Sequence, residues 1–346
     1  MEDDSFPPPP RVGIAYNLKK GVRAGTEDAE AEYDSFDTIR AIRGALESAG
    51  CGVALLEADA GFVEKVKSAG VDIVFNIAEG ANGRGREAQV PAVLSFLGVP
   101  YTGSDETALG IALDKAMTKR YLSAFGVETP AAVLADSPDA EGLKALRFPV
   151  IVKPDCEGSG KGIGELATAG DAGELRALLE RDLRLYGGPM LAEEYITGRE
   201  FTVGLLGNGE GLRVFEPMEI RYRRGDPERG VYSYRVKTNY REYVDYECPA
   251  AVPPAVSDAM KRVSAKIFRA LGCRDLARID FRLSRDGVPY FIEINPLPGL
   301  APGYSDYPML AGFCGVGYGD LILRILRSAM ERYGMVPAAK AEVSRA

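Results

Sequence analysis

The densest group of side chains able to do chemistry lies in residues 277–299, ARIDFRLSRDGVPYFIEINPLPG. Its alternation of polar and apolar residues predicts two short strands joined by a tight turn at Asp286-Gly287. Successive side chains of a strand face opposite sides, so the polar residues of both strands can share one surface. We expect Arg278, Asp280, Phe291, Glu293 and Asn295 on that surface and Ile279, Phe281, Leu283, Tyr290, Ile292 and Ile294 on the other.

Two carboxylates and an amide on one surface need an explanation, because like charges on paired strands repel each other. A bound cation would supply it. Oxygen ligands without sulfur or imidazole suit Mg²⁺ that is held partly by water and by nucleotide phosphates. The alternative is a solvated hairpin whose acids are neutralised by Arg278 and Arg282, and the hairpin alone leaves both interpretations open.

The amino-acid composition restricts which catalytic groups the protein can use. The 346 residues contain no histidine, which excludes Ser-His and Cys-His nucleophiles, imidazole bases and histidine-bound zinc. Catalysis must use Lys, Arg, Asp, Glu, Tyr, Ser and a metal-bound nucleotide, a set that favours phosphoryl transfer. The five cysteines form no Cys-x-x-Cys pair, so we expect reduced thiols.

Charge and hydropathy argue against two classes of partner. The net charge of −8 disfavours a general nucleic-acid or anionic-membrane surface. The chain has no run of about 18 apolar residues, and its first ten residues, MEDDSFPPPP, are unlike a signal peptide. We therefore expect a cytoplasmic protein with small-molecule substrates and neither nucleic-acid nor membrane partners.

The elements that must position the hairpin begin with alternating strands and helices. Strands expected at 11–16, 53–56 and 72–76 alternate with helices at 34–50, 61–68 and 89–97, which predicts a doubly wound parallel α/β domain. The loop after the third strand, AEGANGRGREAQ, lies where open α/β sheets bind ligands but lacks the G-x-G-x-x-G fingerprint. It is either a polar substrate rim or a solvated loop, with the charged residues Glu79, Arg84, Arg86 and Glu87.

The rest of the chain mixes helices and strands. A single helix is expected over 105–125, with Lys115 and Lys119 one turn apart. The further elements are expected as strand 150–153, strand 164–166, helix 171–186, strands 190–195, 200–206 and 212–220, helix 254–271, the hairpin, and helices 309–314 and 318–333.

Two loops in this part of the chain could contact phosphates. Residues 154–164, PDCEGSGKGIG, offer backbone amides and Lys161, although they do not match a Walker A loop. A flexible turn is the alternative interpretation. Residues 221–240, RYRRGDPERGVYSYRVKTNY, lack periodicity and predict either a mobile loop over a site or a charged solvent loop.

Taken together, these stretches resemble the ATP-grasp superfamily and, within it, the D-alanine–D-alanine ligase group. ARIDF followed by FIEINPLPG is similar to that group's Arg-x-Asp and Glu-x-Asn signature. The resemblance implies that Asp280, Glu293 and Asn295 bind Mg²⁺ and that Arg278 lies beside the reacting carboxylate.

Other motifs resemble the group's nucleotide site. LDK at 113–115 and VIVKP at 150–154 are similar to the segments that carry its two ATP-contacting lysines, here Lys115 and Lys153. EGSGKG resembles the phosphate loop, with Ser159 and Lys161, and VKTNY resembles a mobile loop, with Lys237. The resemblance gives Ser159 and Lys237 catalytic roles beside Arg278. LAEEYITGREFTV resembles the adenine hinge and ribose contact, with Glu193, Glu194, Ile196 and Glu200.

The departures from the group's pattern surround the substrate. The opening Gly-Gly-x-Ser is absent, and the group's amine-binding glutamate matches Glu32 through a short gapped alignment. Its His-Gly dipeptide is replaced by Glu79-Gly80, its acidic partner by Arg84, and the tyrosine after the loop lysine by Thr238. A serine that binds the second substrate matches Ser305 with one inserted residue. The substrate residues implied by the resemblance are Glu32, Glu79, Arg84, Gly299 and Ser305.

The resemblance implies an ATP-dependent carboxylate–amine ligase that forms a peptide bond through an acyl phosphate. Small amino acids or peptides are the implied substrates, with D-alanine as the default. ATP and two Mg²⁺ ions are the implied cofactors, Mn²⁺ is an alternative metal, and a homodimer is expected. The implied fold is α/β with an α+β, two-subdomain ATP-grasp part, divided into a disordered tail 1–10, an α/β substrate domain 11–104, a central subdomain 105–189, a C-terminal subdomain 190–335 with the Mg²⁺ site, and a tail 336–346.

Three other functions stay open at this point. A related ligase could use another carboxylate, with Arg84 or Arg86 as its counter-ion. A nucleotide-binding regulator without catalysis is disfavoured by the intact magnesium signature and Arg278. A dinucleotide-dependent oxidoreductase is suggested only by the N-terminal pattern and is weakened by the missing glycine fingerprint.

Overall fold

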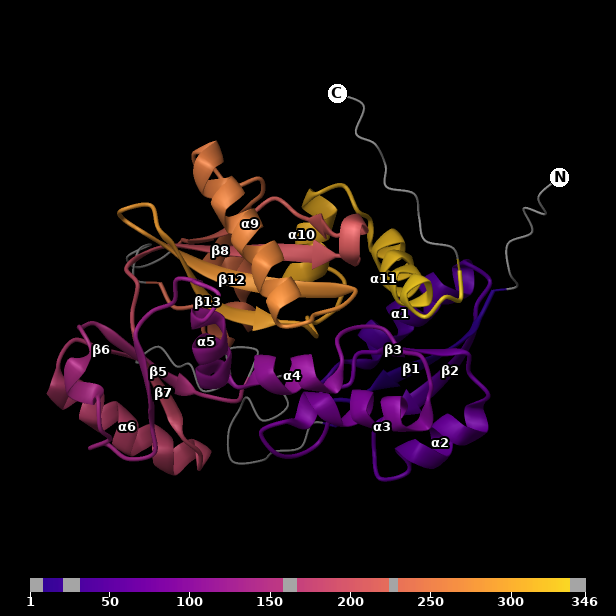
Figure 1. The fold of residues 1–346 in the computed structure, drawn as a ribbon, viewed down its shortest axis with the longest axis horizontal. Helices are drawn as coiled ribbons and strands as arrows, with labels where there is room; N and C mark the ends of the chain where they lie inside the picture. The colour runs from indigo at the N-terminus through magenta and orange to yellow at the C-terminus, as the bar shows by residue number, and fades with distance from the viewer. Residues whose placement is uncertain (1–8, 21–31, 158–166, 224–229, 337–346) are drawn as a thin grey trace.

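A computed structural model describes residues 9–20, 32–157, 167–223 and 230–336, which form three sheets with flanking helices (Figure 1). Most of the two expected tails, 1–10 and 336–346, lies outside these ranges. So do Ser159, Lys161 and the strand expected at 164–166.

The first sheet is the parallel, doubly wound unit expected from the sequence. Its strands are β1 (Arg11–Tyr16), β2 (Gly52–Glu57) and β3 (Ile73–Asn76), all parallel, in the order β2-β1-β3. One face packs on α1 (Phe36–Ser48), and the other packs on α2 (Phe62–Ala69) and α3 (Gln89–Leu97). Helix α1 begins after Ser35, whose hydroxyl accepts a hydrogen bond from the Thr38 amide.

The C-terminal helix α11 (Tyr318–Arg332) lies beside α1 and completes the core over that face of the first sheet (Figure 1). Its apolar stripe, Leu321, Ile322, Ile325 and Leu326, is at most 3% exposed. Helix α10 (Asp306–Phe313) contributes Leu310 to the same core. Across the described ranges, no single helix is long and apolar enough to cross a membrane, and α10 and α11 meet that test only as a pair bent by 104°.

The expectation of a single helix over 105–125 is wrong, because the structure has two helices there. Helix α4 (Glu106–Leu113) ends before Asp114, which has an extended backbone at ψ 97°, and α5 (Lys115–Ser123) begins after it. The Asp114 carboxylate accepts a hydrogen bond from the Met117 amide at 2.7 Å and caps α5. An aspartate in a helical pattern can therefore start a new helix instead of continuing the old one.

The second sheet is antiparallel and has the order β4-β7-β5-β6. Its strands are β4 (Ala132–Ala135), β5 (Val150–Pro154), β6 (Thr168–Ala169) and β7 (Met190–Glu194), and α6 (Ala172–Tyr186) packs on it. Strand β4 was not expected from the sequence, because its four residues are too few to show a clear period.

The third sheet is also antiparallel, with the order β11-β10-β8-β12-β13, and β9 pairs with β8. Helix α9 (Pro254–Ala270) packs on one face. The strands are β8 (Gly198–Leu206), β9 (Arg213–Val214), β10 (Met218–Tyr222), β11 (Val244–Glu247), β12 (Leu276–Ser284) and β13 (Pro289–Asn295).

The structure corrects two expectations in this sheet. The single strand expected over 212–220 is interrupted before Pro217, whose missing N–H cannot join a ladder, and becomes β9 and β10. The irregular segment expected over 221–240 contains α7 (Tyr234–Thr238) and is followed by α8 (Tyr240–Tyr243) and β11. Helices of five and four residues are too short to give a periodic signal.

Candidate active site

The β12–β13 hairpin brings its polar residues together as the alternation predicts. Asp280 lies directly opposite Glu293, and Arg278 lies opposite Asn295. The turn contains Gly287 at φ +79°, a conformation that glycine adopts readily. Two carboxylates, a guanidinium and an amide therefore share one face of the third sheet.

One expectation about the hairpin is wrong. The register shifts between Asp280 and Phe281, so Phe281 pairs with Phe291, and Ile292 is the extra residue of a bulge. Phe291 therefore lies in the core, fully buried, instead of beside Glu293. Ile292 lines the cavity on the polar face instead of packing in the core. Strict alternation failed because the bulge adds one residue to β13.

Arg278 is held by acids on two sides. It donates from Nε and Nη2 to the Asp280 carboxylate at 3.1 and 2.8 Å, and from Nη1 to Asp306 at 3.4 Å. Asp306 is 2% exposed and also accepts hydrogen bonds from the hydroxyls of Tyr232 at 3.0 Å and Tyr246 at 2.9 Å. Asp306 could not be predicted as part of the site from the sequence, because its position depends on the course of the loop after the hairpin.

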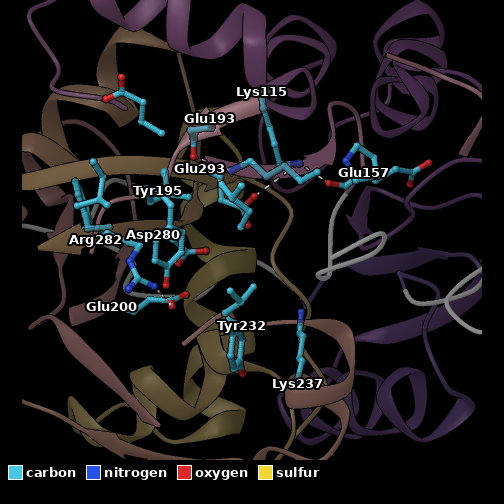
Figure 2. A pocket seen from close by; sticks show the side chains of 18 of the residues that line it. Lys115, Glu157, Glu193, Tyr195, Glu200, Tyr232, Lys237, Asp280, Arg282 and Glu293 are labelled. Atoms are coloured by element: carbon cyan, nitrogen blue, oxygen red, sulfur yellow. Dashed lines mark hydrogen bonds and ion pairs between the residues drawn. The ribbon is translucent and has the colours of Figure 1, made fainter. Parts of the chain in front are cut away.

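A cavity open to solvent lies between the second and third sheets, and its empty space is about 910 Å³ with the open mouth included. In Figure 2, Lys115 and Lys237 reach into it from opposite sides, with Glu293 between them and Asp280, Arg282 and Glu200 on one wall. The residues expected at the nucleotide that line this cavity are Lys115, Lys153, Glu193, Glu194, Ile196 and Glu200, together with Lys237, Arg278, Asp280 and Glu293.

The lysines of this cavity are paired with buried acids. Lys153 Nζ lies 3.2 Å from Glu193, and Lys119 Nζ lies 2.6 Å from the same carboxylate. Burial lowers the pKa of Lys119 to about 8, with Lys153 adding to the effect and Glu193 opposing it. Burial alone would raise the pKa of Glu193, but the two lysines lower it overall. Lys119 was expected only as a helix residue, and here it holds the acid that positions Lys153.

Lys115 lies in the cavity beside Glu293, one of the carboxylates expected to bind magnesium. Its ammonium donates to the carbonyl oxygen of Glu157 and lies 3.7 Å from Glu293. Burial acts to raise the pKa of Glu293, but Lys115, Lys153, Arg278 and Lys237 lower it overall. Glu293 therefore carries a negative charge that lysines surround.

Glu194 and Glu200 differ in their surroundings. The Glu194 carboxylate pairs with Arg147 at 2.9 Å on the protein surface. Glu200 accepts hydrogen bonds from Arg282 at 3.0 Å and from the Tyr222 hydroxyl at 2.7 Å. The Arg282 guanidinium stacks over the Tyr195 ring at 4.6 Å. Arg282 thus holds Glu200, the residue expected near the ribose, and does not neutralise Asp280 and Glu293.

A second cavity, also open to solvent, lies between the first and third sheets, and its empty space is about 1100 Å³ with the open mouth included. It is lined by four of the five residues expected at the substrate, namely Glu32, Glu79, Gly299 and Ser305, and by Asn295. Lys237 and Arg278 line both cavities. Any ligands of the two cavities therefore meet at these two cations.

Arg84 lies outside this cavity. Its side chain is 70% exposed, donates to the Asp114 carboxylate and lines neither of the two cavities. Arg86 is buried and holds Glu32 with contacts of 2.7 and 2.6 Å, and it also contacts Glu157 at 3.0 Å. Arg84 thus lies outside both cavities and pairs with the acid at the helix break, and its role at the substrate stays a prediction.

The donor set suits magnesium. Asp280, Glu293 and Asn295 offer only oxygen ligands from opposed strand positions, as a hard divalent cation requires. The Asn295 side-chain oxygen already accepts a hydrogen bond from the Leu297 amide at 3.1 Å, which fixes its orientation and leaves a lone pair. Burial and Glu293 raise the pKa of Asp280 while Arg278 lowers it, so an added cation would stabilise the ionised pair.

Comparison with known proteins decides the family. Residues 131–327 match the family described as D-ala D-ala ligase C-terminus. A D-alanine–D-alanine ligase of Bordetella pertussis is 36% identical over 313 residues, which are 90% of this chain and 95% of that protein. The chain belongs to the D-alanine–D-alanine ligase family. The uncharacterized protein y4sG of Sinorhizobium fredii is 37% identical over 261 residues, 75% of each chain.

The solved structures agree on the fold. A crystal structure of D-alanine–D-alanine ligase from Bacillus anthracis complexed with ATP has a TM-score of 0.73 and 23% identity, covering 94% of this chain and 99% of that one. This member of the D-alanine–D-alanine ligase family is therefore a ligase with an ATP-grasp fold that forms a carbon–nitrogen bond. The resemblance in the sequence is confirmed at the level of family and fold.

Proposed function

We propose that the protein activates the carboxylate of one small amino acid with ATP and Mg²⁺ and joins it to the amine of a second. The single observation that carries this proposal is the junction of two cavities at Lys237 and Arg278, beside the Asp280–Glu293 pair. One cavity has the lysines and hinge residues of a nucleotide site, and the other has the residues expected at a substrate. D-alanine is the default substrate because the relatives carry its name.

The residues divide the chemistry between them. Asp280, Glu293 and Asn295 would hold Mg²⁺, which neutralises phosphate charge when bound. Lys115, Lys153 and Lys237 would bind the phosphates. Ser159 and Lys161 are assigned to the phosphate loop by the sequence motif alone.

Arg278 has the central role in the proposed mechanism. Its guanidinium lines both cavities at their junction, and we assign to it the binding of the carboxylate that accepts the phosphoryl group and the stabilisation of the tetrahedral oxyanion. The γ-phosphoryl group of ATP would pass to that carboxylate, and ADP would leave. The ammonium group of the second substrate would then lose a proton, the resulting amine would attack the acyl carbon, and phosphate would leave. Ser305 and Gly299 would bind the second substrate's carboxylate, and Glu193, Glu194, Ile196 and Glu200 would contact the nucleoside.

The test is ADP release from Mg²⁺-ATP against a panel of D- and L-amino acids, singly and in pairs. Release that depends on a particular pair, with the dipeptide identified by mass spectrometry, would support the proposal and name the substrates. ATP binding without ADP release for any pair would contradict it. The expected homodimer belongs to the same proposal, and sedimentation of the purified protein measures it directly.

A further inference from the structure

The cavity that we assign to the substrate contains an acid that is already paired with an arginine. Glu32, the glutamate that the sequence resemblance suggests as the amine receptor, receives Arg86 Nη2 at 2.7 and 2.6 Å and Arg86 Nε at 3.1 Å. Side-chain exposures of 9% for Arg86 and 8% for Glu32 show that the pair is buried. A substrate ammonium would gain less from a carboxylate that already makes three contacts with Arg86.

Glu79 in the same cavity has the opposite character. It lines the cavity, and within the described parts of the chain its carboxylate has neither a hydrogen bond nor an ion pair. Its neighbour Glu87 is 8% exposed and is likewise without such a partner in those parts. Burial raises the pKa of Glu79 well above its ordinary value, with Glu87, Glu32 and Asp34 adding to the effect and Arg86 opposing it. Arg86 offsets the repulsion between these carboxyls only in part, so ionising Glu79 is costly unless a ligand supplies a further cation.

The backbone next to Glu79 is fixed. The Gly80 amide donates to Asn17 Oδ1 at 2.9 Å, and its carbonyl accepts from the Tyr33 hydroxyl at 3.4 Å. Gly80 has φ +78°, and a Cβ there would lie 2.0 Å from the Arg86 carbonyl oxygen. Only glycine fits this turn, so the side chain of Glu79 starts from a defined position on the cavity wall.

The same cavity provides the opposite charge at its junction end. Lys237 and Arg278 line it where it meets the nucleotide cavity. The cavity therefore offers cations to a carboxylate and the Glu79 carboxyl to an ammonium group. An amino acid carries both of these charges.

We infer that Glu79, with Glu87 behind it, binds the ammonium group of the amino acid whose carboxylate is activated. The inference rests on the proposed function and names the chemical class of its first substrate, which is an amino acid. Hydroxy acids and plain carboxylic acids of the same size have no ammonium group and therefore bind poorly. Glu32 and Arg86 then act as a structural pair in the wall rather than as the amine receptor.

The test isolates the first half-reaction. Each protein receives Mg²⁺-ATP, hydroxylamine and one acid, either D-alanine, D-lactate or propionate, and hydroxylamine converts an acyl phosphate into a hydroxamate with release of phosphate. We expect hydroxamate from D-alanine and little from the other two acids. Glu79→Gln should raise the KM for D-alanine at least about tenfold, leave the KM for ATP near its original value, and reduce the preference over D-lactate by a similar factor.

Matched variants complete the design. Glu64→Gln makes the same change on the exposed face of α2, where Glu64 is 80% exposed, and should behave as the wild type. Glu79→Asp keeps the charge but shortens the side chain, so the preference for D-alanine should persist with a smaller rise in KM. Thermal melting checks folding, and removing one like charge from the Glu79–Glu87 pair should not lower the melting temperature.

The results distinguish failure of the proposed function from failure of the role assigned to Glu79. If the wild type forms no hydroxamate from any amino acid in a wider D and L panel, the proposed function fails. If the wild type activates an amino acid and Glu79→Gln keeps the same KM and the same preference, only the assignment of Glu79 is overturned.

Discussion

At the residue scale, the site consists of charges that hold one another in place. Asp280 and Asp306 hold Arg278 from two sides, and Glu193 holds Lys153 together with Lys119. Fixed positions matter because preorganised groups stabilise developing charge without having to reorganise during the reaction. The alternation of residues 277–295 predicted the pairing of the hairpin, but it did not predict Asp306 or Lys119, which approach from elsewhere in the chain.

Arg278→Ala should retain ATP binding and lose turnover. The guanidinium is expected to stabilise the oxyanion, and removal of such a donor costs on the order of 10²-fold or more in kcat. ATP binding by calorimetry and ADP release should be measured on the same preparation. Arg324→Ala, on the exposed face of α11, serves as the control. Turnover close to that of the wild type would remove Arg278 from the mechanism.

The Asp34 carboxyl should make the stability of the folded protein depend on pH. Burial raises its pKa from 3.8 to about 7, against the opposing effects of Lys19 and Thr38. The folded state therefore holds a proton that the unfolded chain has released, so the unfolding free energy falls as pH rises from about 4 to about 7. Other titratable groups that interact with Asp34 are Glu79 and Tyr318.

Asp34→Asn should remove this contribution. The variant should be more stable than the wild type at pH 8, by up to about 4 kcal/mol from a shift of about three pKa units, and should differ little at pH 4. Urea unfolding at both values measures the difference. Asp258→Asn, on the exposed side of α9, is the control. A stability gain equal at both pH values would contradict the role of Asp34.

At the element scale, most of the longer strands and helices could be predicted from the sequence, and the short elements and irregular points could not. Alternation and helical spacing report the average periodicity of an element, whereas the bulge at Ile292 and the helix break at Asp114 each depend on one residue. The short elements β4 and α7 have too few residues to show a period. These irregular points shape the site, because the bulge turns Ile292 toward the nucleotide cavity and the break starts α5 at Lys115.

A pair of alanine variants tests the bulge. Phe291→Ala should lower the unfolding free energy by about 3–5 kcal/mol, because the ring is fully buried in the core. Ile292→Ala should cost much less stability and should raise the KM for ATP, because its side chain lines the nucleotide cavity. Urea unfolding and steady-state kinetics measure the two effects. A regular hairpin without a bulge would give the reverse pattern.

At the scale of the whole molecule, Asp275 connects three parts of the chain. It is 0% exposed, and its carboxylate accepts from the Gly103 amide at 2.8 Å, from Asn208 at 2.6 Å and from Arg332 at 2.9 Å. No sequence pattern predicted this connection, because its members lie up to 229 residues from one another in the chain. The division into 11–104, 105–189 and 190–335 stays a prediction, and α11 packs on the sheet of the first part.

Asp275→Asn should lower the unfolding free energy by up to about 3 kcal/mol, because it removes the charge of a fully buried carboxylate that pairs with the partly exposed Arg332 guanidinium. Asparagine tolerates the backbone of Asp275 at φ +65°, so the effect should come from the lost charge. Denaturant unfolding measures the change, and Asp320→Asn in the exposed pair with Arg324 is the control. Equal stability of the two variants would show that Asp275 does not connect these parts.

The packing of α11 against α1 has a consequence for synthesis on the ribosome. The first sheet and α1 are translated well before α11, the helix that shares a core with Ile39 and Ile42. Until α11 is made, the apolar face of α1 lacks this cover, so we expect the first sheet and α1 to reach full stability only after α11 has been translated.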